Sequence, residues 1–307
     1  MSVLLSRLGF SNNQHNRHPN RNMLESNLAS LQAYRSLVSE NLNRLLESLK
    51  LGSGFLTLAW MHECFKILPM INNAFAKLMM EIEYPVNTWE SSSVDEYLDC
   101  TINLLELLNS ISSCLSHLNH ARVSLTHALS IMERSPDIAI ERMKEIKKHD
   151  SIIKEFNEII GGDENKRNII GNGKEFIFHE AMLVMKSIGF WVCGVVLLGL
   201  KSDVGPNMEI VRRGVFVDSS LMALDSIFLK KFREEKGMVK EVEEVNECVR
   251  LIVSSGIGDS SDGMELKRRL EVVGNGLKGI KEEEEGLFGS VMATRNEVLE
   301  TLRRNNH

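Results

Sequence analysis

The sequence predicts an all-α protein, an elongated multi-helix bundle with long amphipathic helices. Its 307 residues are 43% hydrophobic but only 6% aromatic, with 15 Met and 5 Pro. This composition favours helices packed by aliphatic and thioether side chains over a β-sandwich. Apolar residues also recur at helical spacing through most of the chain, as on the buried face of an amphipathic helix.

Residues 1–22 are predicted to form a disordered N-terminal tail. The first 24 residues contain three arginines and two histidines but no acid, a composition that transit peptides share with ordinary tails. Because serines are few, we favour a tail over a transit peptide, which makes a plastid location the less favoured one. The segment also lacks the continuous apolar region of a secretory signal.

Residues 23–160 are predicted to form an N-terminal helical bundle. A first helix begins near Leu24 and ends at a glycine stop, Gly52. A second follows over about Phe55–Glu83, and Pro69 is expected to kink or divide it, since proline lacks the backbone N–H that the helix needs.

The clearest element is a long amphipathic helix from about Val94 to Met132. Ser91–Ser93 are candidate N-caps, and Asp95 and Glu96 occupy the first turn, where the helix dipole favours anions. Leucines share one arc of this helix and polar residues the other, so its apolar stripe requires a packing partner. Another helix is expected from Pro136 to about Ile160.

A glycine-rich stretch, 161–175, is predicted to be a loop and is the best candidate for a domain boundary. Residues 176–307 are predicted to form a C-terminal helical region that packs on the first bundle. Its first element is an apolar helix at 176–200.

Charge and cysteine usage exclude several classes of protein. The formal net charge is −6 with no strongly basic half, so nucleic acid is not an expected partner. The five cysteines are odd in number and form no C-x-x-C pair, as expected of reduced thiols in an intracellular protein. Neither a disulfide scaffold nor a zinc ribbon is expected.

Three histidines, His117, His120 and His127, share the polar arc of the long helix. Spacing of three residues can place two imidazoles on one metal, but His127 lies about two turns beyond His120. Solvated or hydrogen-bonded histidines are therefore favoured over a metal or pH-responsive site.

Other motifs are incomplete. His62 and His179 each begin a zinc-protease pattern whose second histidine is replaced by Lys66 and Leu183. The glycines of 171–174 lack the flanking residues of a phosphate loop. We therefore predict no catalytic residue, no cofactor and no metal.

Three glycines near the C-terminus, Gly274, Gly276 and Gly279, lack the preceding strand that a dinucleotide-binding fold requires. They are instead expected to weaken or bend a helix, because glycine is a poor helix former.

An uncharged run, Ser187–Leu200, leaves three interpretations open. Its fourteen residues rise about 21 Å as a helix, short of a hydrocarbon layer of about 30 Å. A buried central helix is favoured over a single membrane span of 176–200 or shallow membrane attachment. In the membrane alternatives, the contacting residues would be Phe190, Trp191, Val195 and Leu198.

A family resemblance rests on three consecutive stretches. Ile82–Glu90 is an acidic, proline-containing turn with a tryptophan, Val94–Asp99 enters a helix, and Leu104–Asn109 is leucine-rich. This succession resembles the plant BYPASS family, most specifically from Trp60 to Glu133 and only weakly beyond about Asp203. The motif residues are Tyr84, Pro85, Trp89, Val94, Asp95, Tyr97, Leu98 and Asp99.

The resemblance implies a plant-specific helical protein without known catalysis that acts in development. The founding type restrains production of a mobile root-derived compound that arrests shoot growth, and related plant proteins associate with exocyst tethering subunits. No catalytic residue is carried over, because the family defines none. Tyr84, Pro85 and Trp89 are expected to pack the second helix against the third; direct partner recognition is the alternative.

We therefore expect a noncatalytic regulator that acts through helix-mediated contacts with an unknown protein partner, for which the resemblance indicates an exocyst subunit. The expected location is intracellular, in the cytoplasm or at a membrane contacted through 176–200. The alternatives are a helical enzyme or binding protein that controls a small signalling metabolite, and an exocyst-associated trafficking factor.

Overall fold

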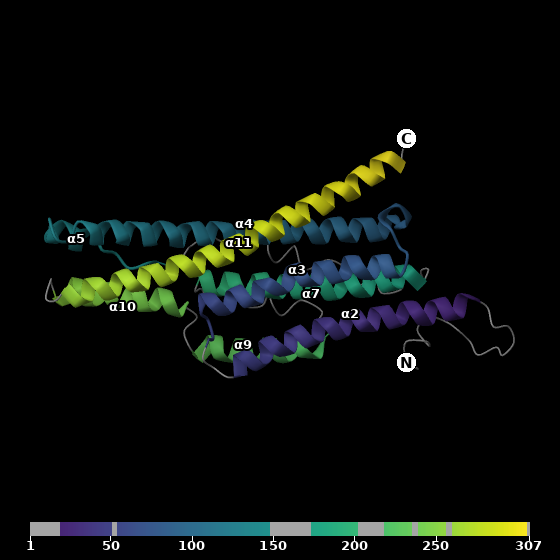
Figure 1. Cartoon of the computed structure of the whole chain (residues 1–307), viewed down its shortest axis with the longest axis horizontal. Coiled ribbons are helices and arrows are strands. Elements are labelled where there is room, and N and C mark those ends of the chain that lie inside the picture. The colour runs from purple at the N-terminus through teal and green to yellow at the C-terminus, as the bar shows by residue number, and fades with distance from the viewer. Residues whose placement is uncertain are drawn as a thin grey trace.

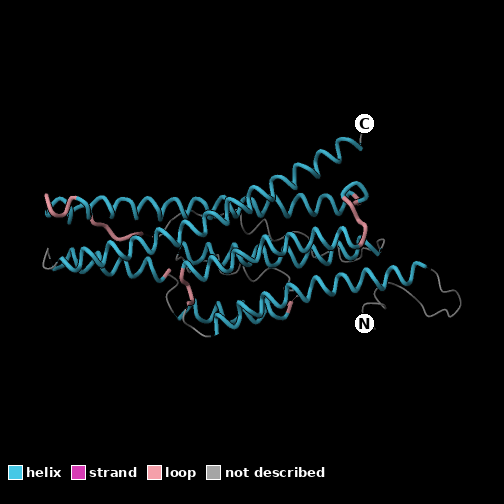
Figure 2. Tube along the Cα trace, in the orientation of Figure 1, coloured by secondary structure: helices cyan, strands magenta, loops and turns pink. Residues whose placement is uncertain are grey.

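A computed structural model describes residues 19–50, 54–147, 173–201, 218–234, 239–255 and 260–305. Within these ranges the chain consists of helices and short connections, without strands, which confirms the predicted all-α bundle (Figure 2). The helices are α2 (Pro19–Lys50), α3 (Leu58–Glu81), α4 (Ser91–Ser130), α5 (Pro136–Arg142), α7 (Gly173–Lys201), α9 (Ser219–Glu234), α10 (Lys240–Ser255) and α11 (Ser260–Asn305), with a 3₁₀ turn η1 (Val86–Thr88).

The predicted domain division falls largely outside the described residues. The part of the predicted tail before Pro19 and the part of the predicted loop before Gly173 lie there. The division near residue 161 therefore stays a prediction. Helices from both sides of it share one hydrophobic core that reaches from Leu31 to Val298.

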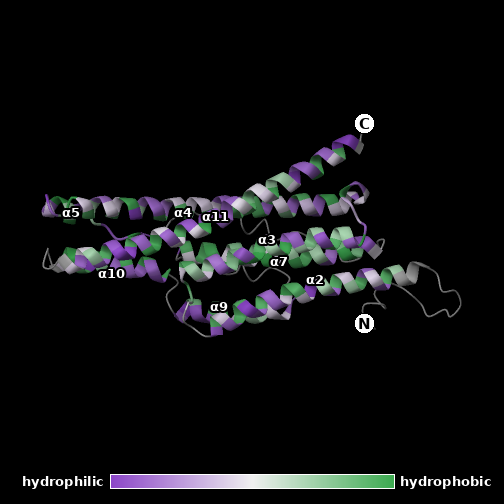
Figure 3. Ribbon diagram, viewed as in Figure 1, coloured by the Kyte–Doolittle hydropathy of each residue, from purple (hydrophilic) through white to green (hydrophobic). Residues whose placement is uncertain are grey.

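The bundle is elongated, and α7 lies in its interior with α2, α3 and α4 packed against it (Figure 1). The long helix α11 packs on α3 and α4, while α10 lies along α11, and α9 lies along α2. Figure 3 shows that hydrophobic residues are concentrated on α3 and α7, whereas the outer helices alternate between hydrophobic and hydrophilic residues. Helices with one apolar stripe thus surround helices that are buried more fully.

Every residue of α7 from Ser187 to Lys201 is buried. By length and composition alone, Gly173–Lys201 could cross a membrane, but 83% of its most apolar 18-residue window is buried inside the structure. The core helix of a soluble protein passes the same test. In this structure the apolar segment therefore occupies the position of a central core helix.

Of the two outcomes expected at Pro69, a kink or a division, the helix is not divided: Pro69 lies inside a continuous α3, and burial of neighbouring residues such as Leu68 and Ile71 offsets the cost of the proline. The expected start of α4 is wrong in detail. The helix α4 begins at Ser91 instead of Val94, so the serines lie inside its first turn. Its N-cap is Glu90, whose side chain makes no capping hydrogen bond.

The helix predicted from Pro136 to about Ile160 ends much earlier. Helix α5 stops at Arg142, and Met143 is extended with φ −73° and ψ 105°. The chain from Met143 to Lys147 is not helical, and residues 148–160 lie outside the described ranges. Side chains of other helices bind the backbone of this segment, so it has no need of helical hydrogen bonds.

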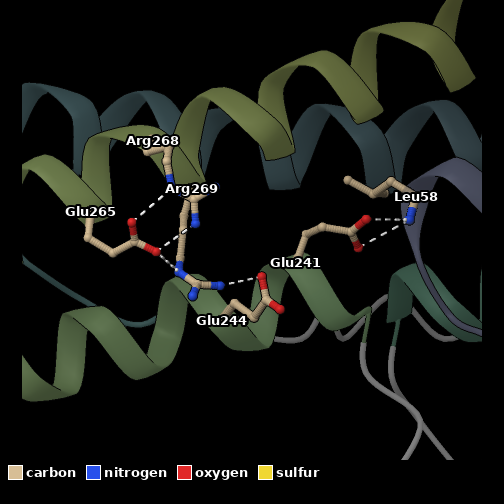
Figure 4. A network of polar contacts seen from close by, with 6 residues as sticks. All are labelled: Leu58, Glu241, Glu244, Glu265, Arg268 and Arg269. Atoms are coloured by element: carbon tan, nitrogen blue, oxygen red, sulfur yellow. Dashed lines mark hydrogen bonds and ion pairs between the residues drawn. The ribbon is translucent and has the colours of Figure 1, made fainter. Parts of the chain in front are cut away.

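Side chains from the preceding turn and from α10 cap the start of α3. The Thr57 hydroxyl oxygen accepts from the Trp60 N–H at 3.1 Å, and both Glu241 carboxylate oxygens lie 3.1 Å from the Leu58 nitrogen, which donates to them. Figure 4 shows this carboxylate of α10 at the start of α3, beside an ion-pair network in which Arg269 of α11 joins Glu244 of α10. Two of the free N–H groups at the start of α3 are thereby satisfied.

The three glycines of 274–279 do not interrupt α11, which is continuous from Ser260 to Asn305. They face other helices closely: a Cβ added at Gly276 would lie 2.7 Å from the Leu58 Cβ, and one at Gly274 would lie 3.3 Å from an Arg122 nitrogen. Their position is explained by close helix packing.

Candidate functional site

The motif residues gather at one corner of the bundle, where α3 ends and α4 and α7 begin. The Trp89 ring lies 4.8 Å from the Phe178 ring of α7 and 5.3 Å from the Tyr97 ring of α4, measured between centroids. The Trp89 indole N–H donates to the Tyr84 carbonyl oxygen at 3.0 Å. Trp89 therefore joins the turn to two helices at once. We call residues 82–101 with the first two turns of α7 the motif corner.

Phe178 is the centre of this aromatic cluster. It is fully buried, and the rings of Phe75 and Tyr84 lie 5.7 and 6.2 Å from it. The turn itself is fixed by Glu83 in the left-handed region, with φ 53°, and by the Lys174 ammonium, which donates to the Glu83 carbonyl oxygen at 2.9 Å. The cluster packs the end of α3 against α7.

The remaining motif residues divide between the core and the surface. Val94 and Tyr97 are buried and Leu98 is half-buried, whereas Pro85, Asp95 and Asp99 are exposed. Burial raises the pKa of Tyr97 to about 12, so its hydroxyl stays protonated at physiological pH. Pro85, Asp95 and Asp99 are the motif positions that are accessible at the surface.

A charged cluster next to the aromatic one was not predicted as a site. His179 of α7 pairs through Nδ1 with the Glu96 carboxylate of α4, and its Nε2 lies 3.5 Å from the Glu175 carboxylate. Glu175 is 1% exposed, and its Oε1 accepts from the Ser92 hydroxyl at 3.1 Å. We call Glu90, Ser92, Glu96, Glu175 and His179 the carboxylate–imidazole cluster.

Charge within the cluster shifts two pKa values. Burial opposes the imidazolium of His179, but hydrogen bonds and charge from Glu96 and Glu175 outweigh burial and raise its pKa. The negative charge of Glu175 raises the pKa of the Glu90 carboxyl. The His179 imidazole, whose pKa is raised by these carboxylates, therefore links α4 to α7.

The cluster joins the start of α4 to α7. The Ser92 hydroxyl donates to Glu175, and Glu96 pairs with His179. Among the described residues, no group of three or more His, Cys, Asp or Glu side chains could hold a metal ion.

The histidines of the polar arc have different surroundings. The His117 Nε2–H donates to the Lys147 carbonyl oxygen at 3.2 Å, while His120 and His127 lie on the exposed side of α4. His117 is thus used in packing a segment that follows α5.

The four residues considered for membrane contact lie in the core. Trp191 and Val195 are 1% and 0% exposed, and the Trp191 indole N–H donates to the Asp225 carboxylate of α9 at 3.1 Å. Phe190 and Leu198 are likewise buried. In this structure a membrane could reach them only if the surrounding helices separated.

Comparison with known proteins supports the resemblance drawn from the motif residues. Protein BPS1, chloroplastic, of Arabidopsis thaliana is 25% identical over 311 residues, covering 93% of this chain and 84% of that protein. This match confirms the predicted resemblance to the BYPASS family. No protein-family model matches the chain, and no solved structure matches it.

Two rice proteins show a similar degree of identity. UPF0496 protein 4 of Oryza sativa subsp. japonica and that of subsp. indica are 23% and 22% identical over 243 residues, covering 72% of this chain. The chain spans about half the length of these two relatives, 52% of each.

Proposed function

We propose that the chain is a noncatalytic plant developmental regulator that acts through contacts between its helices and a protein partner. The observation that carries this proposal is the match to Protein BPS1 over 93% of the chain. On the same resemblance, its role is to restrain a mobile root-derived signal that arrests shoot growth.

The arrangement of the polar side chains supports a noncatalytic role. Three side chains capable of acid–base chemistry contact other helices. His179 and Glu175 join α7 to α4, and Glu241 caps α3. Active sites instead use such groups in an accessible cavity where they converge on a substrate.

The partner and the location belong to the proposal. An exocyst subunit is the partner that the resemblance indicates. Three locations are proposed: the cytoplasm, a membrane surface and the plastid. The plastid is included because Protein BPS1 is named chloroplastic.

Affinity purification of the tagged full chain from soluble, membrane and plastid fractions of plant tissue tests all of these points. We expect one protein, an exocyst subunit, to be enriched reproducibly by mass spectrometry over a tag-only control. A different reproducible partner would correct only the partner's identity. If no fraction containing the chain yields a reproducible partner, the interaction function is wrong. The fraction that contains the chain identifies its location.

A further inference from the structure

A short non-helical segment, Met143–Lys147, which begins with the extended residue Met143, is held by side chains of two helices; we call it the strap. The Ile146 N–H donates to the Asn246 side-chain oxygen of α10 at 2.7 Å, and the Asn246 side-chain N–H donates back to the Ile146 carbonyl at 3.1 Å. The Lys147 carbonyl accepts from His117 of α4 at 3.2 Å. Asn246 is 2% exposed.

Asn246 therefore binds the strap as a neighbouring strand would, by exchanging two hydrogen bonds with one backbone residue. Bonds of this kind recognise an extended backbone without reading its side chains, as in complexes where a peptide adds to a sheet edge. Since the amide is buried, leaving it without these bonds would be costly. The site is thus built for an extended chain.

The side chains of the strap add a pattern to this recognition. Met143 and Ile146, three residues apart, are 5% and 2% exposed and belong to the core. Between them Lys144 is exposed, and Glu145 pairs with Arg250 of α10 at 2.8 Å. The pattern is two apolar anchors three residues apart, with an acid immediately before the second.

The strap leaves part of the α10 surface uncovered. Beside it lies a separate open pocket of about 610 Å³, lined by Met143 and Glu145 on the strap and by residues of α10 that include Val249, Arg250 and Leu251. Leu251 is 55% exposed, although it is apolar. A longer extended segment could make the contacts of the strap and cover this surface as well, which would give it an advantage over the strap.

We propose that α4 and α10 form a peptide-binding groove whose intramolecular occupant is the strap, and that an extended segment of a partner protein with the same pattern displaces it. This inference rests on the proposed function, because it specifies the kind of partner segment. The strap is autoinhibitory: a tethered occupant lowers the apparent affinity for a free peptide by the fraction of molecules in which the groove is filled.

The test uses a fluorescently labelled peptide with the chain's own residues 139–147. It is added to a full chain whose strap lacks both apolar anchors, Met143→Ser with Ile146→Ser, which we call the emptied variant because its groove should be empty. Fluorescence anisotropy should show binding to this variant at least about tenfold tighter than to the natural chain. Adding Asn246→Ala should weaken that binding about tenfold, because two hydrogen bonds are lost. Adding Asn41→Ala instead should leave it unchanged, since that exposed amide lies on α2 and bonds the Leu37 carbonyl.

Equal binding to the emptied variant and the natural chain, or no effect of Asn246→Ala, would overturn the proposal. If the emptied variant lacks a native circular dichroism spectrum, hydrogen exchange of the natural chain decides instead. Excess peptide should then accelerate exchange of the Ile146 amide, and an unchanged rate would overturn the groove. Recovery of a reproducible partner from tissue together with failed peptide binding would sink the groove and leave the proposed function standing.

Discussion

At the scale of single residues, the most consequential group is the imidazole of His179. It lies between Glu96 of α4 and Glu175 of α7, and Glu90 adds a third carboxyl, whose pKa is raised by the negative charge of Glu175. Carboxylates packed this closely repel one another unless a cation or a proton separates them. The His179 imidazole lies between two of these carboxylates, so we expect the packing of α7 on α4 to depend on its protonation.

This dependence predicts how stability changes with pH. The folded pKa of His179 is raised above its ordinary value of 6.5, so the folded chain binds more protons than the unfolded chain above that pH. Its contribution to stability is complete below about pH 6.5 and is lost as the pH rises through the folded pKa. In His179→Gln, the free energy of unfolding should therefore vary less with pH in this window. Urea denaturation at a series of pH values measures it.

His120→Gln is the matched control, since His120 lies exposed on α4. Its pH dependence should follow that of the natural chain. An identical slope in His179→Gln and the natural chain above about pH 6.5 would show that the imidazolium does not stabilise the corner.

At the scale of helices, the sequence predicts helix boundaries best where one face of the helix is strongly apolar. The start and end of α4 differ from the predicted ones by only a few residues, because its leucine arc extends along the whole helix. The early end of α5 could not be predicted, since the Asn246 amide that replaces helical hydrogen bonds lies 100 residues away from Ile146.

The carboxylate–imidazole cluster escaped prediction for the same reason. Glu96 and His179 are 83 residues apart, and neither lies in a motif that signals the other. Only the Glu175 to His179 spacing of four residues on one helix carried a signal, because such residues share a face.

Replacing a glycine of α11 by alanine is predicted to change the free energy of unfolding in opposite directions at two positions, Gly276 and Gly289. At Gly276, an alanine Cβ would lie 2.7 Å from the Leu58 Cβ, and the start of α3 has little freedom to move away. We expect Gly276→Ala to lower the free energy of unfolding by about 1–3 kcal/mol, the usual cost of overpacking. At Gly289 a Cβ would meet nothing within 4 Å, so Gly289→Ala should raise stability by up to about 1 kcal/mol through helix propensity.

Urea denaturation of both variants beside the natural chain makes the comparison. Each substitution adds the same methyl group to the same helix, so propensity cancels and only the contact with α3 differs. Stabilisation by Gly276→Ala would mean that α11 and α3 do not pack as closely as described.

At the scale of the whole molecule, α7 lies at the centre of one core that includes helices from both ends of the chain. A central helix of this kind makes unfolding cooperative, because its loss exposes a face of every helix packed against it. A membrane-spanning α7 would behave differently, because without detergent its apolar surface would be exposed to water.

The substitution Val195→Asp separates these two arrangements in detergent-free buffer. Val195 is 0% exposed, and a carboxylate there has no described partner, so we expect a loss of about 4 kcal/mol or more, seen as a large fall in the midpoint of thermal unfolding. Ile138→Asp is the control: Ile138 is 46% exposed on α5, and the change there should be within about 0.5 kcal/mol. A natural chain that unfolds cooperatively without detergent, and a Val195→Asp chain that does not, would locate α7 in a protein core. A natural chain that needs detergent to stay folded, or equal melting of all three chains, would contradict the central position of α7.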